Sequence, residues 1–328
     1  MKILNGCRVL ESLKLRPSCM FSNLQIDSRS LRELVIESDG LSTIDISAPD
    51  LFSLRFSGGF VYPGVRLNGA SGFSSLAEAE LNFNEPTASL GCFSGQLKSL
   101  PELLRVCDFP SQLKFLLELL QHVEKITVGS WCLETLSASE AMGMSSLPSR
   151  WRNITVHTTV CKLELPGIMY LLQSSPLLER LVIHNQKSNN TFKNKDFPEP
   201  YDFDEKQFWP SQKEFHCVAN HLKSVEIIGL EFDSENSKIL LALAKFLLKE
   251  AVGLEKITID AELRMSHQGV TIDPHDLRDF HDVIQLQKGG QRASRKAEVI
   301  VKYRFNGPRY ELRKHKQNTG TQSIPRFA

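Results

Sequence analysis

The stretch Leu31-Arg-Glu-Leu34-Val-Ile36 decides how this chain folds, because its pattern L-x-x-L-x-L recurs along the sequence. Within each copy the second and third apolar residues are two positions apart, so on a β-strand they point to the same side. Such a unit cannot bury its apolar side alone, so neighbouring units must stack. The copies are Leu10-x-x-Leu13-x-Leu15, Leu31-x-x-Leu34-x-Ile36, Leu41-x-x-Ile44-x-Ile46, Leu51-x-x-Leu54-x-Phe56, Leu76-x-x-Ala79-x-Leu81, Val123-x-x-Ile126-x-Val128, Val160-x-x-Leu163-x-Leu165, Leu178-x-x-Leu181-x-Ile183, Leu222-x-x-Val225-x-Ile227 and Leu254-x-x-Ile257-x-Ile259.

The spacing of the copies predicts an irregular leucine-rich-repeat solenoid, which is an α/β fold with a curved parallel sheet and with helices and loops on the convex side. Leu10, Leu31, Leu51 and Leu76 are 21, 20 and 25 residues apart, within the roughly 20–29 residues of such repeats. Later steps reach 47 residues, which is consistent with units that carry a helix or a loop. Leu41 falls between two regular copies, so it is either a very short extra turn or a coincidence.

Three segments between the copies have helical spacing of their apolar residues: 110–123, 166–173 and 237–251. Residues 1–184 are therefore expected to form the repeat region. The polar, acidic and aromatic segment 185–214 contains several prolines and is expected to be a long exposed loop. Residues 306–328 are expected to form a disordered tail.

The charge of the chain is nearly balanced, with 39 Lys and Arg against 38 Asp and Glu, but it is unevenly spread. From residue 285 onward the sequence has eleven basic residues and only the acids Glu298 and Glu311. A body with a net charge near −8 therefore carries a tail near +9. The acidic body makes nucleic acid an unexpected partner for the main surface. The basic tail is either a solvated end or a patch that binds phosphate groups or directs the chain to the nucleus.

The seven cysteines contain no C-x-x-C pair, and several lie in or beside apolar repeat positions, where a thiol acts as a small hydrophobe. We therefore expect reduced cysteines and a cytoplasmic and/or nuclear location. The first residues lack the apolar core of a signal peptide, and no run approaches the roughly 18 apolar residues of a membrane span. No membrane partner is expected.

The sequence favours a protein without enzymatic activity, cofactor or metal. It lacks the glycine-rich phosphate loops and the serine nucleophile elbow. His216, Cys217 and His221 are close together, but zinc sites need about four ligands at recognisable spacings, and no second pair of ligands follows. Cys217 is better explained as a core residue. The sequence therefore predicts no catalytic, cofactor-binding or metal-binding residue.

The expected functional surface is the concave side of the sheet, where the residues between and beside the apolar positions point outward. A mixture of both charges without an aromatic stripe favours a protein partner over nucleic acid. The alternative is a solvated polar face without a ligand. The predicted partner-binding residues are Lys14, Arg16, Glu33, Glu37, Asp45, Arg55, Glu78, Glu80, Lys125, Lys162, Glu164, Arg180, His184, Glu226, Lys256 and Asp260.

The C-terminal third resembles a known plant region. His221-Leu-Lys-Ser-Val-Glu-Ile-Ile-Gly229, then Lys245-Phe-Leu-Leu-Lys-Glu-Ala251 and Leu254-Glu-Lys-Ile-Thr-Ile259, are similar to the FBD region at the C-terminus of many plant F-box/leucine-rich-repeat proteins. Trp209 and Cys217 match the Trp and Cys that recur upstream in that region. The resemblance implies that residues 215–305 form FBD-like repeats.

Other segments extend this resemblance over most of residues 1–305. Arg292-Ala-Ser-Arg-Lys-Ala-Glu-Val-Ile-Val301 is similar to the end of the FBD region, and Leu171-Leu-Gln-Ser-Ser-Pro-Leu-Leu-Glu-Arg-Leu181 resembles the helix-to-strand unit that precedes it. Ser30-Leu-Arg-Glu-Leu-Val-Ile36 is similar to the first repeats of the family. The resemblance implies the substrate-recognition part of an F-box-type (SCF) ubiquitin-ligase receptor that binds an unidentified protein target.

The sequence departs from the family at its beginning. Family members open with an F-box, a helical module that docks on the Skp adaptor of a cullin ubiquitin ligase. Nothing before Leu10 can hold such a module, and Trp151-Arg152, which resembles its closing pair, lies deep in the repeats. A Skp adaptor and a cullin are therefore expected partners only if a longer product supplies an F-box. The alternative is a stand-alone interaction or decoy module without a ubiquitin-ligase role.

Overall fold

The structure is a computed structural model of the full chain. It describes residues 2–3, 7, 9–16, 24–37, 44–59, 75–84, 109–141, 148–159, 164–186, 218, 220–231, 235–262, 292–304 and 309–313.

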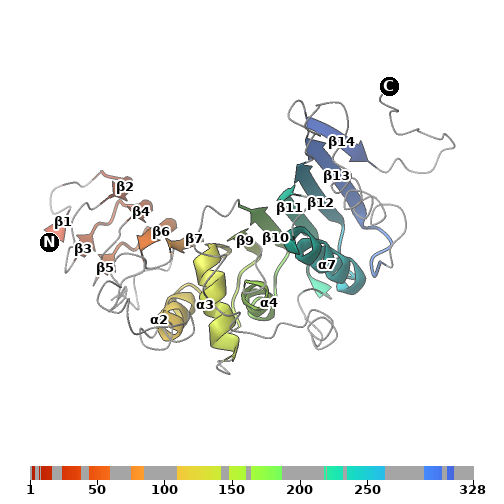
Figure 1. The fold of residues 1–328 in the computed structure, drawn as a ribbon. Coiled ribbons are helices and arrows are strands. Elements are labelled where there is room, and N and C mark those ends of the chain that lie inside the picture. Colours follow the sequence, from red (N-terminus) through yellow and green to blue (C-terminus); the bar gives the residue numbers. More distant parts are fainter. Residues whose placement is uncertain are drawn as a thin grey trace, which may run out of the picture.

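The protein is an α/β structure built on one large sheet, in which the described residues contribute eleven strands. Neighbouring strands are parallel, except that the last pair is antiparallel. The strands follow one another along an arc (Figure 1). In spatial order they are β2 (Ser12–Leu15), β4 (Glu33–Glu37), β6 (Ser53–Gly59), β7 (Glu78–Asn84), β8 (Lys125–Val128), β9 (Asn153–Thr158), β10 (Arg180–Asn185), β11 (Ser224–Glu231), β12 (Lys256–Glu262), β13 (Glu298–Arg304) and β14 (Arg309–Arg313).

The apolar pattern sets the register of this sheet. Each strand from β2 to β13 aligns its two inward apolar residues with those of its neighbours, so the described strands share two continuous apolar rows. From β4 to β13 these residues are buried, whereas Leu13 and Leu15 on the edge strand β2 are only partly buried. The first row contains Leu13, Leu34, Leu54, Ala79, Ile126, Ile154, Leu181, Val225, Ile257 and Val299, and the second contains Leu15, Ile36, Phe56, Leu81, Val128, Val156, Ile183, Ile227, Ile259 and Val301.

A repeated backbone contact fixes the entry into each strand. The carbonyl of the residue before β2, Glu11, accepts two hydrogen bonds, from the amides of Arg32 (2.7 Å) and Glu33 (2.9 Å) at the start of β4. The same double contact recurs along the sheet, which satisfies backbone groups that would otherwise be unpaired at the turns. The other accepting carbonyls belong to Arg32, Phe52, Ala77, Glu124, Arg152, Glu179 and Lys223.

The outer side of the arc changes along the chain. Its first part carries a small parallel sheet of β1 (Lys2–Ile3), β3 (Leu24–Asp27) and β5 (Ile44–Ser47), and its later part carries helices (Figure 1). Both cover the apolar rows, because the inward residues of β3 and β5 belong to the same core as the helices. The helices are α2 (Phe109–Leu119), α3 (Ser130–Ala141), α4 (Leu165–Gln173) and α7 (Glu235–Glu250).

The copy at Leu41 is neither an extra turn of the large sheet nor a coincidence. Its residues Ile44 and Ile46 are buried in β5, on the outer side of the arc. The segment has the alternation of a strand, but a repeat of about 20 residues has room for two strands, and the pattern does not say which sheet each one joins.

The copy at Val160 is also placed differently from the prediction. Leu165 begins α4, and the strand of this repeat is β9, which presents Ile154 and Val156 to the core. Trp151 occupies the position of the first leucine, where it is buried and donates from Nε1 to the carbonyl of Leu120 at 2.9 Å. An aromatic residue at this position hides the repeat from a search for aliphatic side chains.

Helix α3 was not expected, whereas α2, α4 and α7 match the three predicted helical segments closely. The apolar residues of α3 do not gather on one face, because the helix packs against α2, α4, β7 and β9. Its buried hydroxyls at Thr135, Ser137 and Ser139 each donate to the carbonyl four residues earlier. This internal bonding lets polar residues lie on a buried helix.

Near the C-terminus, Arg309–Arg313 form β14, within the range where a disordered tail was expected. These residues pair with β13 from Ile300↔Arg313 to Arg304↔Arg309. The basic composition suggested disorder, but backbone pairing to an existing edge strand does not require an apolar sequence. The rest of the expected tail, and most of the expected loop at 185–214, lie outside the described residues.

Val225→Asp is expected to destabilise the protein by about 3–5 kcal/mol, since it places an uncompensated charge in the core. The control Ser224→Asp introduces the same residue one position earlier, on the outward side, where the register neighbours are Arg180 and Lys256. The free energy of unfolding, measured with urea and circular dichroism, should fall for Val225→Asp and stay equal or rise for Ser224→Asp. Equal losses in both would show that the two sides of β11 are assigned wrongly.

Gly167→Ala is expected to lower the free energy of unfolding by about 1–3 kcal/mol through overpacking. A Cβ at Gly167 would lie 2.1 Å from the carbonyl oxygen of Leu133, so α3 and α4 would have to separate. At the control Gly253→Ala the nearest atom is 3.2 Å away, and a smaller loss is expected. Urea unfolding of both variants measures the difference, and equal stability of the two would contradict the close contact of the helices.

Candidate functional site

The side of the large sheet opposite the helices carries three rows of outward side chains, which we call the concave face. Each row contains one position from successive strands. The first is Ser12, Glu33, Ser53, Glu78, Lys125, Asn153, Arg180, Ser224, Lys256 and Glu298, the second is Lys14, Val35, Arg55, Glu80, Thr127, Thr155, Val182, Glu226, Thr258 and Ile300, and the third includes Glu37, Ser57, Asn82, His157, His184, Ile228, Asp260 and Lys302.

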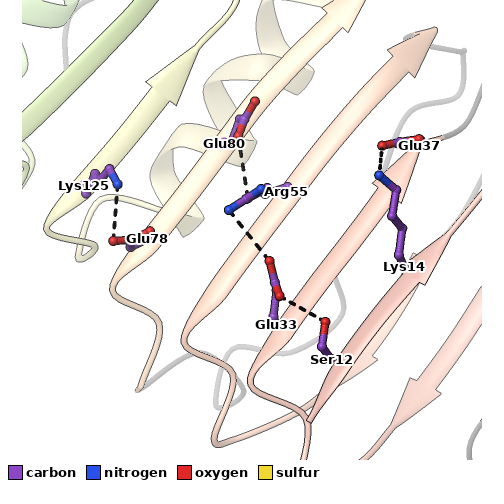
Figure 2. A network of polar contacts seen from close by, with 8 residues as sticks. All are labelled: Ser12, Lys14, Glu33, Glu37, Arg55, Glu78, Glu80 and Lys125. Carbon is purple, nitrogen blue, oxygen red and sulfur yellow. Dashed lines mark hydrogen bonds and ion pairs between the residues drawn. The ribbon is translucent and has the colours of Figure 1, made fainter. Parts of the chain in front are cut away.

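Charged side chains in the first part of this face form ion pairs between neighbouring strands (Figure 2). Arg55 lies between Glu33 and Glu80, with nitrogen–oxygen distances of 3.7 Å to each. Ser12 donates to Glu33 at 3.0 Å, and Lys125 approaches Glu78 at 3.4 Å. The register brings together residues that are 20 to 50 positions apart in the sequence.

At the edge of the face, Glu37 accepts hydrogen bonds from both Lys14 and Arg16. Its pKa lies below the ordinary value, chiefly because of these two hydrogen bonds. A parallel case occurs on the rim of the sheet, where Glu179 binds Arg152 and Lys223 and likewise has a lowered pKa. Both carboxylates therefore remain ionised under mildly acidic conditions.

Later strands continue this arrangement. Arg180 on β10 donates to Glu226 on β11 at 3.1 Å, and Arg304 on β13 donates to Glu262 on β12 at 2.7 Å. Exposed pairs of this kind contribute little to stability individually. Their main effect on the surface is that positive and negative groups on adjacent strands neutralise one another.

Near β12 and β13 the concave face is partly buried, although Lys256 and Glu298 in its first row are exposed. Thr258, Asp260 and Ile300 are 5%, 4% and 2% exposed, although their strand positions point outward. The prediction that Asp260 contributes to an accessible face is therefore wrong, because other parts of the chain bury it. Strand alternation predicts the direction of a side chain but not what covers it.

Two imidazole rings lie at the centre of the face. His157 on β9 and His184 on β10 are register partners, and their rings stack with centroids 4.9 Å apart and planes inclined by 11°. The amide nitrogen of Gln186 is 2.9 Å from Nδ1 of His157. The pKa of His157 lies below its ordinary value, chiefly because of burial and then because of the neighbouring His184, while Glu80 acts in the opposite direction.

Three of the predicted partner-binding residues are not placed on this face. Asp45 lies on β5, in the small sheet on the outer side of the arc. Glu164 is fully buried before α4, where its carboxylate accepts hydrogen bonds from Ser130, Thr158 and Thr159. Both predictions are wrong, because each residue belongs to a copy that does not form a strand of the large sheet. Lys162 lies outside the described residues.

The other predicted residues lie on the concave face, except Arg16, which lies directly beside it because it follows the last residue of β2. Sequence reasoning missed the contribution of β9, namely Asn153, Thr155 and His157. The alternation of Ile154 and Val156 was the available signal for this strand. It was overlooked because Trp151 replaces the leading leucine.

The described residues contain no group of three or more His, Cys, Asp and Glu side chains that could hold a metal ion. His216 and Cys217, considered above as ligands, lie outside them. Cys132 is buried, and burial raises the pKa of its thiol to about 12. Among the described helices, none combines the length and apolar composition needed to cross a membrane.

Comparisons with known proteins identify relatives in Arabidopsis thaliana. An F-box/LRR-repeat protein is 26% identical over 264 residues, which cover 79% of this chain and 53% of that protein. A protein named as an F-box protein is 33% identical over 188 residues, covering 56% of this chain and 44% of its own length. A protein named as an F-box/FBD/LRR-repeat protein is 25% identical, over 77% of this chain and 49% of its own length.

The chain thus spans about half the length of the curated relatives it matches. No family model matches it, and no solved structure matches it. The resemblance stated from the repeat and FBD-like segments is confirmed: the relatives of this chain are plant F-box/LRR-repeat and F-box/FBD/LRR-repeat proteins.

Proposed function

We propose that this chain is a leucine-rich-repeat solenoid that binds a protein target on its concave face. In a longer product that carries an F-box, it would act as the substrate-recognition part of an SCF ubiquitin-ligase receptor. The role is one of binding, without catalysis, and it would be carried out in the cytoplasm or the nucleus.

The observation that carries this proposal is the continuous alignment of outward positions from β2 to β11. The parallel register presents side chains from successive strands on one side, while the helices occupy the other (Figure 1). Extended surfaces of this kind suit the recognition of another macromolecule. The names of the relatives, which combine F-box and LRR-repeat, support the same class of protein.

The charge pattern of the face favours protein as the bound molecule. Lys14, Arg55, Lys125 and Arg180 each pair with a carboxylate on a neighbouring strand, so the face is not a basic surface. Nucleic acid binding requires clustered basic residues that neutralise phosphates. Mixed polar rows with exposed ion pairs are typical of the rim of a protein–protein interface.

A second candidate is a stand-alone interaction or decoy module, which would bind the same target without ubiquitylation. The two candidates predict the same contacts on the concave face and differ only in whether a Skp adaptor is recruited.

The double variant Glu78→Lys with Glu80→Lys is expected to fold and to lose binding. It removes the carboxylate partner of Lys125 and one of the two carboxylate partners of Arg55, and it reverses the charge at two half-buried outward positions. Binders selected from a display library of plant protein fragments should bind the variant at least about tenfold more weakly, because two reversed charges oppose any group that fits the original carboxylates. Affinity can be measured by biolayer interferometry and folding by circular dichroism.

A matched control separates the partner contact from the internal ion pair. The exchange Glu78→Lys with Lys125→Glu keeps a pair of opposite charges between β7 and β8 but inverts its direction. If this exchange variant binds as tightly as the unmodified chain, the ion pair between β7 and β8 matters only for the stability of the sheet. The target would then not recognise the individual charges of Glu78 and Lys125. Retained binding by the variant with both glutamates changed would contradict the proposed site.

The ligase role can be tested by supplying an F-box. Residues 1–328 alone are expected not to retain a purified Skp adaptor in a pull-down, whereas the same residues joined to an N-terminal F-box should retain it, because the F-box carries the docking helices. Strong retention of the adaptor by residues 1–328 alone would contradict the proposal that the F-box binds the adaptor and the concave face binds the target.

A further inference from the structure

The stacked pair His157 and His184 lies at the centre of the concave face. Its strands, β9 and β10, have five and four other strands of the large sheet on their two sides among the described residues. Both imidazoles are half-buried, so part of each ring remains accessible. Around them are Thr155 on β9, Val182 on β10 and Ile228 on β11, none of which carries a charge, and Val182 is itself buried.

The charged groups around the pair are engaged with one another. They come from each neighbouring strand: Glu80 pairs with Arg55, Lys125 with Glu78, and Arg180 with Glu226. The centre of the face is therefore an uncharged area, enclosed by ion pairs that neutralise each other. Interfaces often have this arrangement, in which an apolar or aromatic centre is surrounded by a polar rim that excludes water.

The hydrogen bond to Gln186 indicates the protonation state of His157. An amide nitrogen only donates, so this contact suits a neutral His157 ring whose Nδ1 accepts and whose proton lies on Nε2. Protonation of Nδ1 would oppose this contact and would bring a positive charge beside the stacked His184. Burial also disfavours the charged form of His157, whose pKa lies below its ordinary value.

We propose that the His157–His184 pair is the contact point for an uncharged, apolar or aromatic side chain of the protein target, and that protonation of the pair releases this target. The inference rests on the proposed function, since it specifies the partner chemistry of the same face. An apolar side chain that covers the rings removes them from water, which costs little for neutral imidazoles and much for an imidazolium.

The sign of the pH dependence follows from this desolvation. While His157 is neutral, an apolar contact with its ring is favourable. Protonation of His157 would place a charge beneath the bound apolar side chain, and Glu80, which pairs with Arg55, offsets it only in part, so affinity falls as the pH falls. A target that offered a carboxylate would give the opposite sign, because it would pair with the imidazolium.

The test uses a random-peptide phage library, selected on the full chain at about pH 7.5, followed by titration of the selected peptides at about pH 7.5 and about pH 5.5. The peptides are expected to share an aromatic or aliphatic residue and to bind roughly tenfold more weakly at the lower pH. His184→Lys, which carries a permanent charge, should reduce affinity by a similar factor at the higher pH. His184→Phe, which keeps an aromatic ring without a second titrating group, should retain affinity and lose part of the pH dependence.

His221→Lys provides the matched control, since it makes the same change at an exposed residue in the turn before β11. Circular dichroism of each variant verifies folding, and nuclear magnetic resonance of His157 should show its pKa rising in His184→Phe, since the charge on His184 lowers it. Acidic peptides that bind more tightly at low pH would overturn the inference. So would peptides that depend on Glu78 and Glu80 but not on His184, although the proposed function would then stand. Failure to select any peptide that depends on either set would contradict both.

Discussion

The structure depends on the parallel register of the large sheet, in which the carbonyl before each strand from β2 to β11 accepts hydrogen bonds from two amides of the next repeat. This contact determines where each strand begins relative to its neighbour. Because side chains alternate along a strand, a slip of one residue would move every apolar residue to the concave face and every charged residue into the core. The two apolar rows, the three polar rows and the position of the helices all follow from the same alignment.

The pattern L-x-x-L-x-L predicted most strands of this sheet because it contains both the strand period and the turn before it. The helices α2, α4 and α7 were predicted separately, from the helical spacing of apolar residues between the copies. The pattern failed where the same local sequence is compatible with two structures, or where another residue type replaces a leucine. Ile44 and Ile46 alternate as in any strand, but join the outer sheet, whereas Trp151 takes the place of a leucine at the start of β9. Helix α3 is buried on several sides and therefore lacks the periodicity that reveals a surface helix.

The direction of each outward side chain could be predicted in the same way, but its surroundings could not. Asp260 occupies an outward position and is nevertheless buried. The ion pairs between Arg55 and two glutamates, or between Arg180 and Glu226, join residues from separate repeats. Such contacts depend on the register between strands and on side-chain conformation. A single sequence without an established register therefore gives the composition of the face but not its pairing.

This pairing determines which part of the face can distinguish one target from another. A target that binds the flanking strands through charge must compete with contacts that already exist within the chain, and each exchange of one exposed ion pair for another gains little. A target that binds at the centre would not have to replace internal ion pairs, because His157 and His184 stack on each other and the residues beside them are uncharged. Burial of apolar surface there adds directly to affinity. Under the proposed function, the ion pairs of the flanks would contribute mainly to exclusion of mismatched charges, while contacts with the imidazole pair would supply the binding energy.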